Sequence, residues 1–412
     1  MHPLLDGWRA LNAAMPAPAS FVLGGVAAWA LVVVLAARFR NRFYATFLAI
    51  LLGTQTALAA ALYPQVRADA AAPLFVYLQA ATFLHFLRLV WPAMRSLPYR
   101  LLVSLPGHVF VGGTILALPW ALPGVFGLAL PGWWAPYALA LFGALQSLRP
   151  RRETRDIVLD GRDAGPLARH PLAAPPAGAG PRPLRLAQIT DPHLGPWMSP
   201  RRLRRLCERV VAADPDLVLL TGDFLTMESQ ATPRHLEDAL APLRQLRGRC
   251  FACMGNHDHE APEVVKTALG VCGVTLLVDD AQTVDTPVGP VQIVGSDFHF
   301  RDRKARLARL ARRHPREEGA LRLWLLHDPG AFRHVPEGEA DLVLAGHTHG
   351  GQVGLVSLGL DWTVVWAAVK MPDHGLFARG PDRLYVHRGT GHYGFPVRLG
   401  VPAEESVLRV WR

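Results

Sequence analysis

The sequence predicts two domains of different class: a transmembrane helical domain, followed by an α/β domain of two stacked, mixed β-sheets flanked by helices. Three observations lead to this expectation. The first 148 residues consist mainly of long apolar runs with few charges, as in membrane-spanning helices. From residue 184, short apolar runs alternate with helical patterns, which is typical of a mostly parallel sheet. From Val274 onward the runs are shorter and richer in turn residues, and a second, mixed sheet accounts for them.

Four apolar stretches define the expected membrane domain. Phe21–Ala37, Phe43–Tyr63 and Pro73–Pro92 each have about the length that crosses a bilayer. Leu101–Leu148 contains no Asp, Glu, Lys or Arg. As a single helix it would be about 72 Å long, against about 30 Å of hydrocarbon, so it must fold back, and Pro119–Gly124 is the expected turn. Five spans result, with four as the alternative.

The charges favour a bacterial inner-membrane protein with its C-terminal domain in the cytoplasm. Of the net charge of +10, +7 lies in the first 150 residues. The rest of the chain is therefore nearly neutral and lacks the strongly basic character of a nucleic-acid-binding domain, so we expect no nucleic-acid partner. Arginines cluster in the loops expected after spans one, three and five, which the positive-inside rule places in the cytoplasm. These are Arg38, Arg40, Arg42, Arg95, Arg100, Arg149, Arg151 and Arg152.

Residues 149–183 are expected to form a flexible linker between the two domains. This segment begins basic and is rich in Pro, Ala and Gly from Gly165 to Pro183, so it has little to bury. The α/β domain then occupies residues 184–412. Its expected helices are Arg201–Ala213, Arg234–Leu246, Pro262–Leu269 and Arg303–His314.

Five apolar, strand-like runs of this domain end in Asp, Asn or His. The run from Asp341 to Ala345 leads into His347 and His349, and two histidines at i and i+2 on an extended chain can reach one point. Each motif alone has an ordinary interpretation, as a turn residue or a buried histidine. Five together favour a metal site at the carboxyl edge of a sheet, where open α/β sheets place their sites. The other four runs are Leu184–Thr190 before Asp191 and His193, Leu217–Thr221 before Asp223, Cys250–Met254 before Asn256, His257 and Asp258, and Leu321–Leu326 before His327.

In order and spacing, these motifs resemble the calcineurin-like metallophosphoesterases, and the resemblance covers residues 184–412. The tail Tyr385–Gly391, with Pro396 after it, is similar to the membrane-attached bacterial branch of that family. Two positions depart from the usual pattern: Gly222-Asp223 continues without the second Asp of many members, and Pro192 stands inside the Asp-x-His motif. Neither departure removes a ligand.

The resemblance implies two divalent metal ions, and the nitrogen and oxygen ligands suit Mn, Fe or Zn. Such a pair activates a shared hydroxide for attack on phosphorus. Asp223 is the implied bridge between the ions. The ligands implied for the first ion are Asp191, His193, Asp223 and His349, and those for the second are Asp223, Asn256, His327 and His347.

Two residues beside the ligands are candidates for catalysis. His257 is not needed as a ligand, so it is a candidate general acid or charge stabiliser; the alternative is a hydrogen bond to a ligand. Asp258 is expected to orient His257 or a ligand rather than to meet the substrate.

The expected function is a membrane-tethered phosphohydrolase that cleaves a phosphoester or pyrophosphate bond in a phosphate-containing small molecule or a lipid-linked substrate. Two segments suggest contact with membrane lipid: Gly359–Met371, which is apolar and contains Trp, and the basic helix Arg301–Arg316. A core strand and a solvated helix are the respective alternatives. Two other functions stay open: a metal-dependent nuclease of the same superfamily, and a non-catalytic membrane sensor that uses the metal–phosphate site.

Overall fold

The computed structural model describes residues 3–172, 182–392, 394 and 397–412. The chain divides into two compact units. One comprises Met1–Leu145 with Gly394–Val397, and the other comprises Gln146–Tyr393 with Arg398–Arg412.

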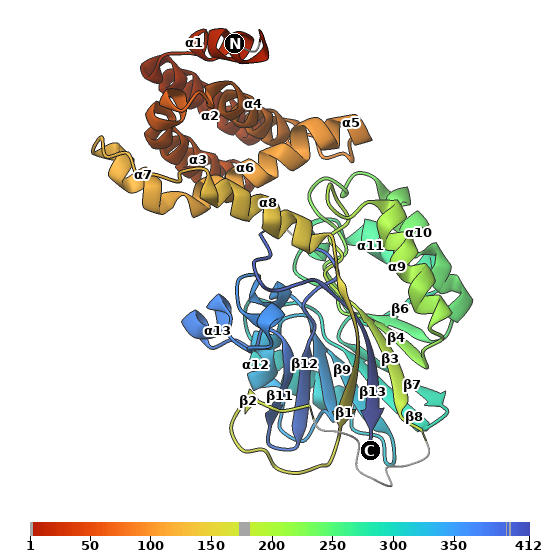
Figure 1. Ribbon diagram of the computed structural model, residues 1–412. Coiled ribbons are helices and arrows are strands. Elements are labelled where there is room, and N and C mark those ends of the chain that lie inside the picture. Colours follow the sequence, from red (N-terminus) through yellow and green to blue (C-terminus); the bar gives the residue numbers. More distant parts are fainter. Residues whose placement is uncertain (1–2, 173–181, 393, 395–396) are drawn as a thin grey trace. The chain divides into compact units, whose positions relative to one another are not determined.

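The N-terminal unit is helical (Figure 1). Among the described residues, three helical stretches are long and apolar enough to cross a membrane: Pro18–Phe39, Arg42–Ala68 and Leu97–Leu116. Many of their large apolar side chains are exposed, as expected for a surface that contacts lipid. The number of spans, expected to be five, stays a prediction. The helices are α1 (Pro3–Ala13), α2 (Pro18–Phe39), α3 (Arg42–Ala68), α4 (Ala72–Arg88), α5 (Leu97–Tyr99), the π-helix η1 (Arg100–Ser104), α6 (Leu105–Leu116), α7 (Leu118–Val125) and α8 (Ala135–Ser147).

The chain reversal expected at Pro119–Gly124 lies further along the sequence. That segment is helical and belongs to α7. Pro119 stands in the first turn of the helix, where proline is tolerated because its missing N–H has no partner there. The helix ends at Val125, and Gly127 and Gly132, both with positive φ, follow before α8.

The C-terminal unit consists of two β-sheets with helices on their outer faces (Figure 1). Its strands are β1 (Arg151–Val158), β2 (Ala168–Arg169), β3 (Leu184–Ile189), β4 (Leu217–Leu220), β5 (Cys250–Ala252), β6 (Thr275–Leu276), β7 (Asp280–Thr286), β8 (Gly289–Gly295), β9 (Leu321–Leu325), β10 (Leu342–Ala345), β11 (Gly375–Arg379), β12 (Asp382–Val386) and β13 (Glu404–Trp411). Its α-helices are α9 (Pro200–Ala212), α10 (Pro233–Leu240), α11 (Pro262–Val271), α12 (Arg303–Arg313) and α13 (Val364–Val369), and its 3₁₀ helices are η2 (Ala241–Leu246), η3 (Asp258–Glu260), η4 (Pro329–His334), η5 (His349–Gly351) and η6 (Val356–Leu358).

The strand order confirms the expected pair of mixed sheets. The first sheet has the order β1-β13-β3-β4-β5-β6, and the second has the order β2-β11-β12-β10-β9-β8-β7. Strands β3, β4 and β5 run parallel, as do β8, β9, β10 and β12, whereas β13 runs antiparallel to β3. Parallel neighbours end at the same edge of a sheet, so the loops after β3, β4 and β5 begin side by side, as do those after β9 and β10.

Three apolar cores hold these layers together. The largest side chains between the sheets include Phe251 and Tyr385. A second core joins the first sheet to α9, α10 and α11, and a third joins the second sheet to α12 and η4. Central strands buried on both faces explain the continuous apolar runs in the sequence.

The expected flexible linker, residues 149–183, is partly a strand. Residues Arg151–Val158 form β1, which pairs in parallel with β13 along its whole length, and β2 pairs with β11. The sequence did not indicate β1 because it is an edge strand with only Ile157 fully buried, so it lacks the apolar pattern of a strand. Residues 173–181, in the Pro/Ala/Gly-rich part, lie outside the described residues.

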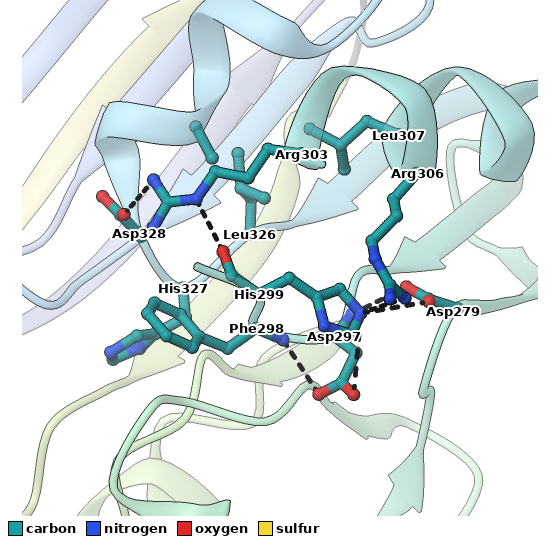
Figure 2. Close-up of a pocket in the computed structure, with 11 residues that line it drawn as sticks. Asp279, Asp297, Phe298, His299, Arg303, Arg306, Leu307, Leu326, His327 and Asp328 are labelled. Carbon is teal, nitrogen blue, oxygen red and sulfur yellow. Dashed lines mark hydrogen bonds and ion pairs between the residues drawn. The ribbon is translucent and has the colours of Figure 1, made fainter. Parts of the chain in front are cut away.

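The basic helix expected near the membrane packs on the protein instead. In α12, Leu307, Leu310 and Ala311 are buried in the core against the second sheet, so its apolar side is not available to a bilayer, and the solvated-helix alternative holds. Figure 2 shows Arg303 and Arg306 extending from α12 into a pocket that His327 also lines.

Candidate metal centre

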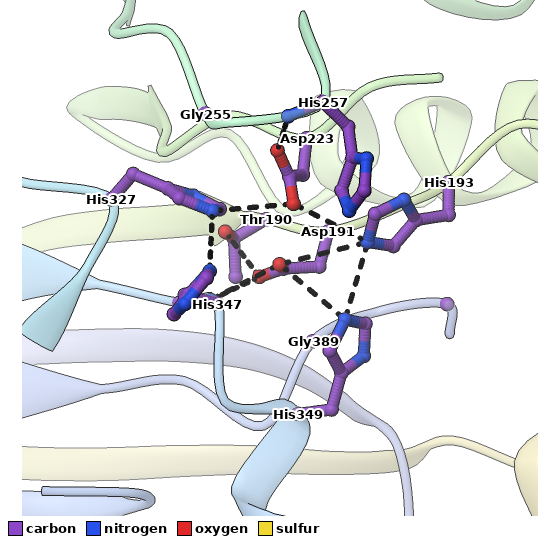
Figure 3. A network of polar contacts seen from close by, with 12 residues as sticks. Thr190, Asp191, His193, Asp223, Gly255, His257, His327, His347, His349 and Gly389 are labelled. Atoms are coloured by element: carbon purple, nitrogen blue, oxygen red, sulfur yellow. Dashed lines mark hydrogen bonds and ion pairs between the residues drawn. The ribbon is translucent and has the colours of Figure 1, made fainter. Parts of the chain in front are cut away.

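The seven side chains expected to bind metal lie on loops that follow β3, β4, β5, β9 and β10. Figure 3 shows six of them, the aspartates and histidines, converging on one region. Five of the seven have a left-handed backbone, which non-glycine residues adopt rarely and at a cost in energy. Such conformations concentrate at functional sites. Their φ values are 49° at Asp191, 44° at His193, 58° at Asp223, 68° at His347 and 51° at His349.

The convergent side chains form two groups of potential ligands. In the first group, Asp191 Oδ1 lies 3.8 Å from His193 Nε2 and 3.6 Å from His349 Nε2. In the second, His327 Nε2 lies 3.3 Å from Asp223 Oδ2 and 3.2 Å from His347 Nδ1. Within each group, one potential ligand atom from every residue lies within 4.8 Å of the others.

One oxygen of Asp223 joins the two groups. Asp223 Oδ2 lies 3.3 Å from His327 Nε2 in its own group and 3.6 Å from His193 Nε2 in the other. The second oxygen, Oδ1, accepts a hydrogen bond of 2.9 Å from the backbone N–H of His257. The carboxylate is therefore oriented with a single oxygen between the two groups.

The residues present fit two divalent cations. Among the described residues, none donates a hydrogen bond to the buried Oδ1 of Asn256, an amide oxygen that a cation would satisfy. Burial lowers the pKa of His193 to about 3 and, together with His327, lowers the pKa of His347 to about 4. Burial, His193 and Arg398 hold the pKa of His349 well below its usual value. Neutral imidazole is the form that binds metal.

His327 and Asp223 form the charged pair of the site. Burial alone would lower the pKa of His327, but the Asp223 carboxylate raises it to about 10. Burial alone would raise the pKa of Asp223, but His327 and His193 hold it well below its usual value. Burial also raises the pKa of Asp191 to about 6. The buried carboxylates thus need positive charge beside them, which a bound cation would supply.

Backbone groups and Thr190 fix the orientation of the ligands. His193 Nδ1 donates to Leu225 O at 3.2 Å, and His327 Nδ1 donates to Thr221 O at 2.6 Å, which directs Nε2 of each ring into the site. Thr190 Oγ1 donates to Asp191 Oδ2 at 2.7 Å. The backbone N–H of His347 donates to both oxygens of Asp191, at 3.1 and 3.0 Å.

Two glycines allow the backbone to pass close to the carboxylates. A Cβ atom on Gly346 would lie 2.2 Å from Asp191 Oδ2, and one on Gly255 would lie 2.2 Å from Asp223 Oδ1. Any larger residue would displace a carboxylate, so these positions require glycine.

The structure gives His257 and Asp258 different places. His257 is partly exposed, its Nδ1 lies 2.8 Å from Glu260 Oε1, and the centre of its ring is 5.6 Å from that of His193. Burial alone would lower the pKa of His257, but Glu260 and Asp223 raise it.

Asp258 is buried and accepts backbone N–H groups from both ligand loops that surround it. Asp223 and Gly255 donate to its Oδ2, and Phe224 donates to its Oδ1, each at 2.8 Å. The catalytic role considered for Asp258 is therefore better described as positioning, since its carboxylate holds the loops that carry Asp223 and Asn256.

Arg398 is a neighbour of the ligands that the sequence did not indicate. It is fully buried, its Nη1 donates to His349 O at 3.1 Å, and its Nη2 lies 3.2 Å from His349 Nδ1. The two residues are far apart in the sequence, and only the fold brings them together.

A pocket beside the second group is lined by Phe298, Arg303 and His327 (Figure 2). The Phe298 ring lies 6.2 Å from the His327 ring and 6.1 Å from the His347 ring, measured between centres. Arg303 pairs with Asp328 at 2.7 Å. The pocket thus presents the Phe298 ring and the Arg303 guanidinium, which is fixed by its ion pair with Asp328, next to the potential ligands.

Two groups of potential nitrogen and oxygen ligands, with Asp223 between them, lie at the carboxyl ends of strands in two stacked sheets, an arrangement that suits a two-metal hydrolase. The match of residues 184–351 to the calcineurin-like phosphoesterase family identifies this part of the chain as a domain of that family. The domain is therefore that of a hydrolase acting on phosphoester bonds.

Curated relatives agree with this assignment. The chain is 29% identical over 250 residues to phosphodiesterase YaeI of Escherichia coli, covering 59% of this chain and 87% of that protein. It is 29% identical over 239 residues to a transmembrane protein with a metallophosphoesterase domain of Danio rerio, covering 54% and 52%. It is 24% identical over 279 residues to UDP-2,3-diacylglucosamine pyrophosphatase LpxG of Chlamydia trachomatis, covering 55% and 83%.

Proposed function

We propose that the chain is a membrane-tethered phosphohydrolase that uses two divalent metal ions to cleave a phosphodiester or pyrophosphate bond in a lipid-linked substrate. The observation that carries the proposal is Asp223 Oδ2, which faces both groups of potential ligands. The relatives named a phosphodiesterase and a pyrophosphatase support both types of bond.

The residues of the chain have separate tasks in this reaction. Bound metal ions lower the pKa of water and stabilise the charge that develops on phosphorus. Asp191 and Asp223 supply negative charge that holds the cations, and the histidines complete the two groups. His327, which is charged beside Asp223, would give up its proton to a bound ion. His257 is placed beside His193 to donate a proton to the leaving oxygen, and its Nδ1 lies 2.8 Å from Glu260 Oε1. Asp258 holds the loops that carry Asp223 and Asn256 next to each other by accepting hydrogen bonds from their backbone N–H groups.

The connection between the units supports a substrate in the membrane. Only Leu148–Pro150 separate the end of α8 from the start of β1, so a short covalent connection tethers the catalytic unit to the chain segment that contains the candidate spans. Tethering raises the local concentration of lipid headgroups at the metal centre but does little for soluble metabolites.

A substrate panel tests the proposed function. The purified full chain, loaded with Mn, Fe or Zn, should hydrolyse a soluble aryl phosphodiester and a lipid-linked pyrophosphate, and a chelator should remove both activities. Metal analysis should give two ions per chain. Preferential degradation of single-stranded DNA would instead favour the nuclease, and full metal loading without turnover of any substrate would favour the sensor.

We expect the catalytic unit to lie in the cytoplasm, because the arginine-rich loops follow the odd-numbered spans. Green fluorescent protein fused after Arg412 should fluoresce, and alkaline phosphatase fused there should be inactive. Fusions truncated after Arg40 and after Ala70 serve as controls, since these positions should report the cytoplasm and the periplasm respectively. Alkaline phosphatase activity after Arg412 would contradict the odd number of spans.

A further inference from the structure

Leu355–Val369, here called the apolar loop, follows the ligands His347 and His349 and exposes large apolar side chains. The exposed fractions are 75% at Leu358, 53% at Leu360, 47% at Trp362 and 65% at Val369. Every side chain of α13, the helix in this loop, is at least partly exposed. The loop is therefore not the core strand that was the alternative for this part of the sequence, although Trp366 packs on Phe377, with ring centres 5.6 Å apart.

The base of the apolar loop is fixed to the metal centre by a buried polar network. Thr348, between the two histidine ligands, donates from Oγ1 to Asp373 O at 2.7 Å. The Asp373 carboxylate accepts from Thr363 Oγ1 and, at 2.6 Å, from Arg169 Nη2. The backbone N–H of Leu355 donates to Trp362 O at 2.8 Å and closes the loop. Because Thr363 and Asp373 are fully buried, this network holds the base of the loop next to the segment that carries His347 and His349.

The other side of the loop is fixed to the start of the catalytic unit. Gln146 Nε2 and Arg151 Nη2 donate to Ser357 Oγ and Ser357 O, each at 3.4 Å. Gln146 Oε1 accepts from the backbone N–H of Gly400 at 2.9 Å, and Gly400 O accepts from the backbone N–H of Ser357 at 2.7 Å. The exposed apolar side chains thus lie close to the residues that connect the catalytic unit to the membrane helices.

We propose that the apolar loop inserts into the interface of the lipid bilayer and presents the metal centre to lipid headgroups. Exposed apolar patches of this kind mark contact surfaces, and Trp with Leu is the composition of a membrane-interface segment. The occupant follows from the chain itself, because its candidate spans keep a bilayer within reach of Gln146. Lys370, which directly follows the loop, adds a positive charge beside the exposed apolar side chains. The carboxylate of Asp361, within the loop, contacts His374, with 3.5 Å between Asp361 Oδ1 and His374 Nε2. For its substrate class, this inference rests on the proposed function.

Insertion can be measured without any assay of activity. Leu358→Cys in the full chain would carry a polarity-sensitive fluorophore, in vesicles of phosphatidylethanolamine and phosphatidylglycerol. The four native cysteines are buried. Val271→Cys on α11 is the matched control, because Val271 is 48% exposed and lies on the helical layer of the first sheet. Quenchers attached to lipid acyl chains should strongly quench the probe at 358 but not the probe at 271.

Two results would overturn the insertion. A probe at 358 that is as accessible to water as the probe at 271 shows that the loop stays in solution. A probe that is shielded from water but not quenched by lipid shows that protein, such as a second copy of the chain, covers the loop.

Activity links insertion to the substrate. The double variant Leu358→Ser/Trp362→Ser should lower the ratio of lipid-linked to soluble phosphodiester turnover by about tenfold, because membrane binding scales with buried apolar area. Val271→Ser/Val278→Ser should leave this ratio unchanged. Equal loss on both substrates would mean that the loop only supports the fold of the site. Absence of turnover by the unmodified chain would refute the proposed function, while the quenching result would still decide insertion.

Discussion

Asp223→Asn is expected to abolish hydrolysis and to weaken the binding of both metal ions. Asp223 Oδ2 faces both ligand groups, and Oδ1 accepts the backbone N–H of His257. In asparagine one of these two positions becomes an NH₂ group. The variant therefore loses either the bridging oxygen or the hydrogen bond that orients it, and in both cases it loses the negative charge. Removal of one partner from a buried charged pair also costs about 3–5 kcal/mol of folding stability, so a lower thermal midpoint should accompany the loss of metal.

The control for this prediction lies at the other end of the same strand. Asp216 precedes β4, is buried, and accepts hydrogen bonds from Arg182 and from the backbone N–H of Arg185. Asp216→Asn should keep two ions per chain and most of the activity, although it should lower the thermal midpoint. The measurements are metal content and turnover of an aryl phosphodiester. If Asp223→Asn lost only one of the two ions, Asp223 would be a ligand of a single ion rather than a bridge.

The convergence of the candidate ligands could be predicted from the sequence because each one lies on a loop that follows a buried strand. The run that ends before Asp223 is continuous and apolar, and those before Asp191 and His327 are mainly apolar, since these strands are covered on both faces. A strand of this kind is visible in the sequence, and so is the residue at its carboxyl end. The helices were predictable for a similar reason, because α9 and α12 repeat their buried positions with helical spacing.

Other features depend on contacts that the sequence does not contain. The edge strand β1 is held by backbone pairing with β13. Because most of its side chains are at least partly exposed, they can be charged, and the sequence of β1 lacks the apolar pattern of a strand. The carboxylate of Asp258 accepts hydrogen bonds from backbone N–H groups. Every residue except proline has such a group, so the partners of Asp258 cannot be recognised from the sequence. Arg398 lies beside His349 through tertiary contacts, in which its Nη2 also donates to Arg388 O and Gly389 O.

His257→Ala is expected to retain both metal ions but to lose about 10²- to 10⁴-fold in turnover, the usual contribution of a general acid. The backbone of His257, not its side chain, donates to Asp223 Oδ1, so the substitution leaves that hydrogen bond in place. The ring packs beside His193 and contacts Glu260, and neither group of potential ligands includes it. Metal content should therefore be unchanged while the chemical step slows.

His259 provides the matched control, because it is two residues away, more exposed, and paired with Asp297 at 2.9 Å. His259→Ala should change turnover by less than about tenfold, since it removes a partly exposed ion pair that belongs to neither group of potential ligands. The leaving group separates the general acid from an alternative role. With a substrate whose leaving group needs no proton, such as a p-nitrophenolate ester, His257→Ala should lose much less activity than with an alkyl ester. Equal loss on both esters would point to a role for His257 in stabilising charge, and loss of one metal ion would make it a ligand.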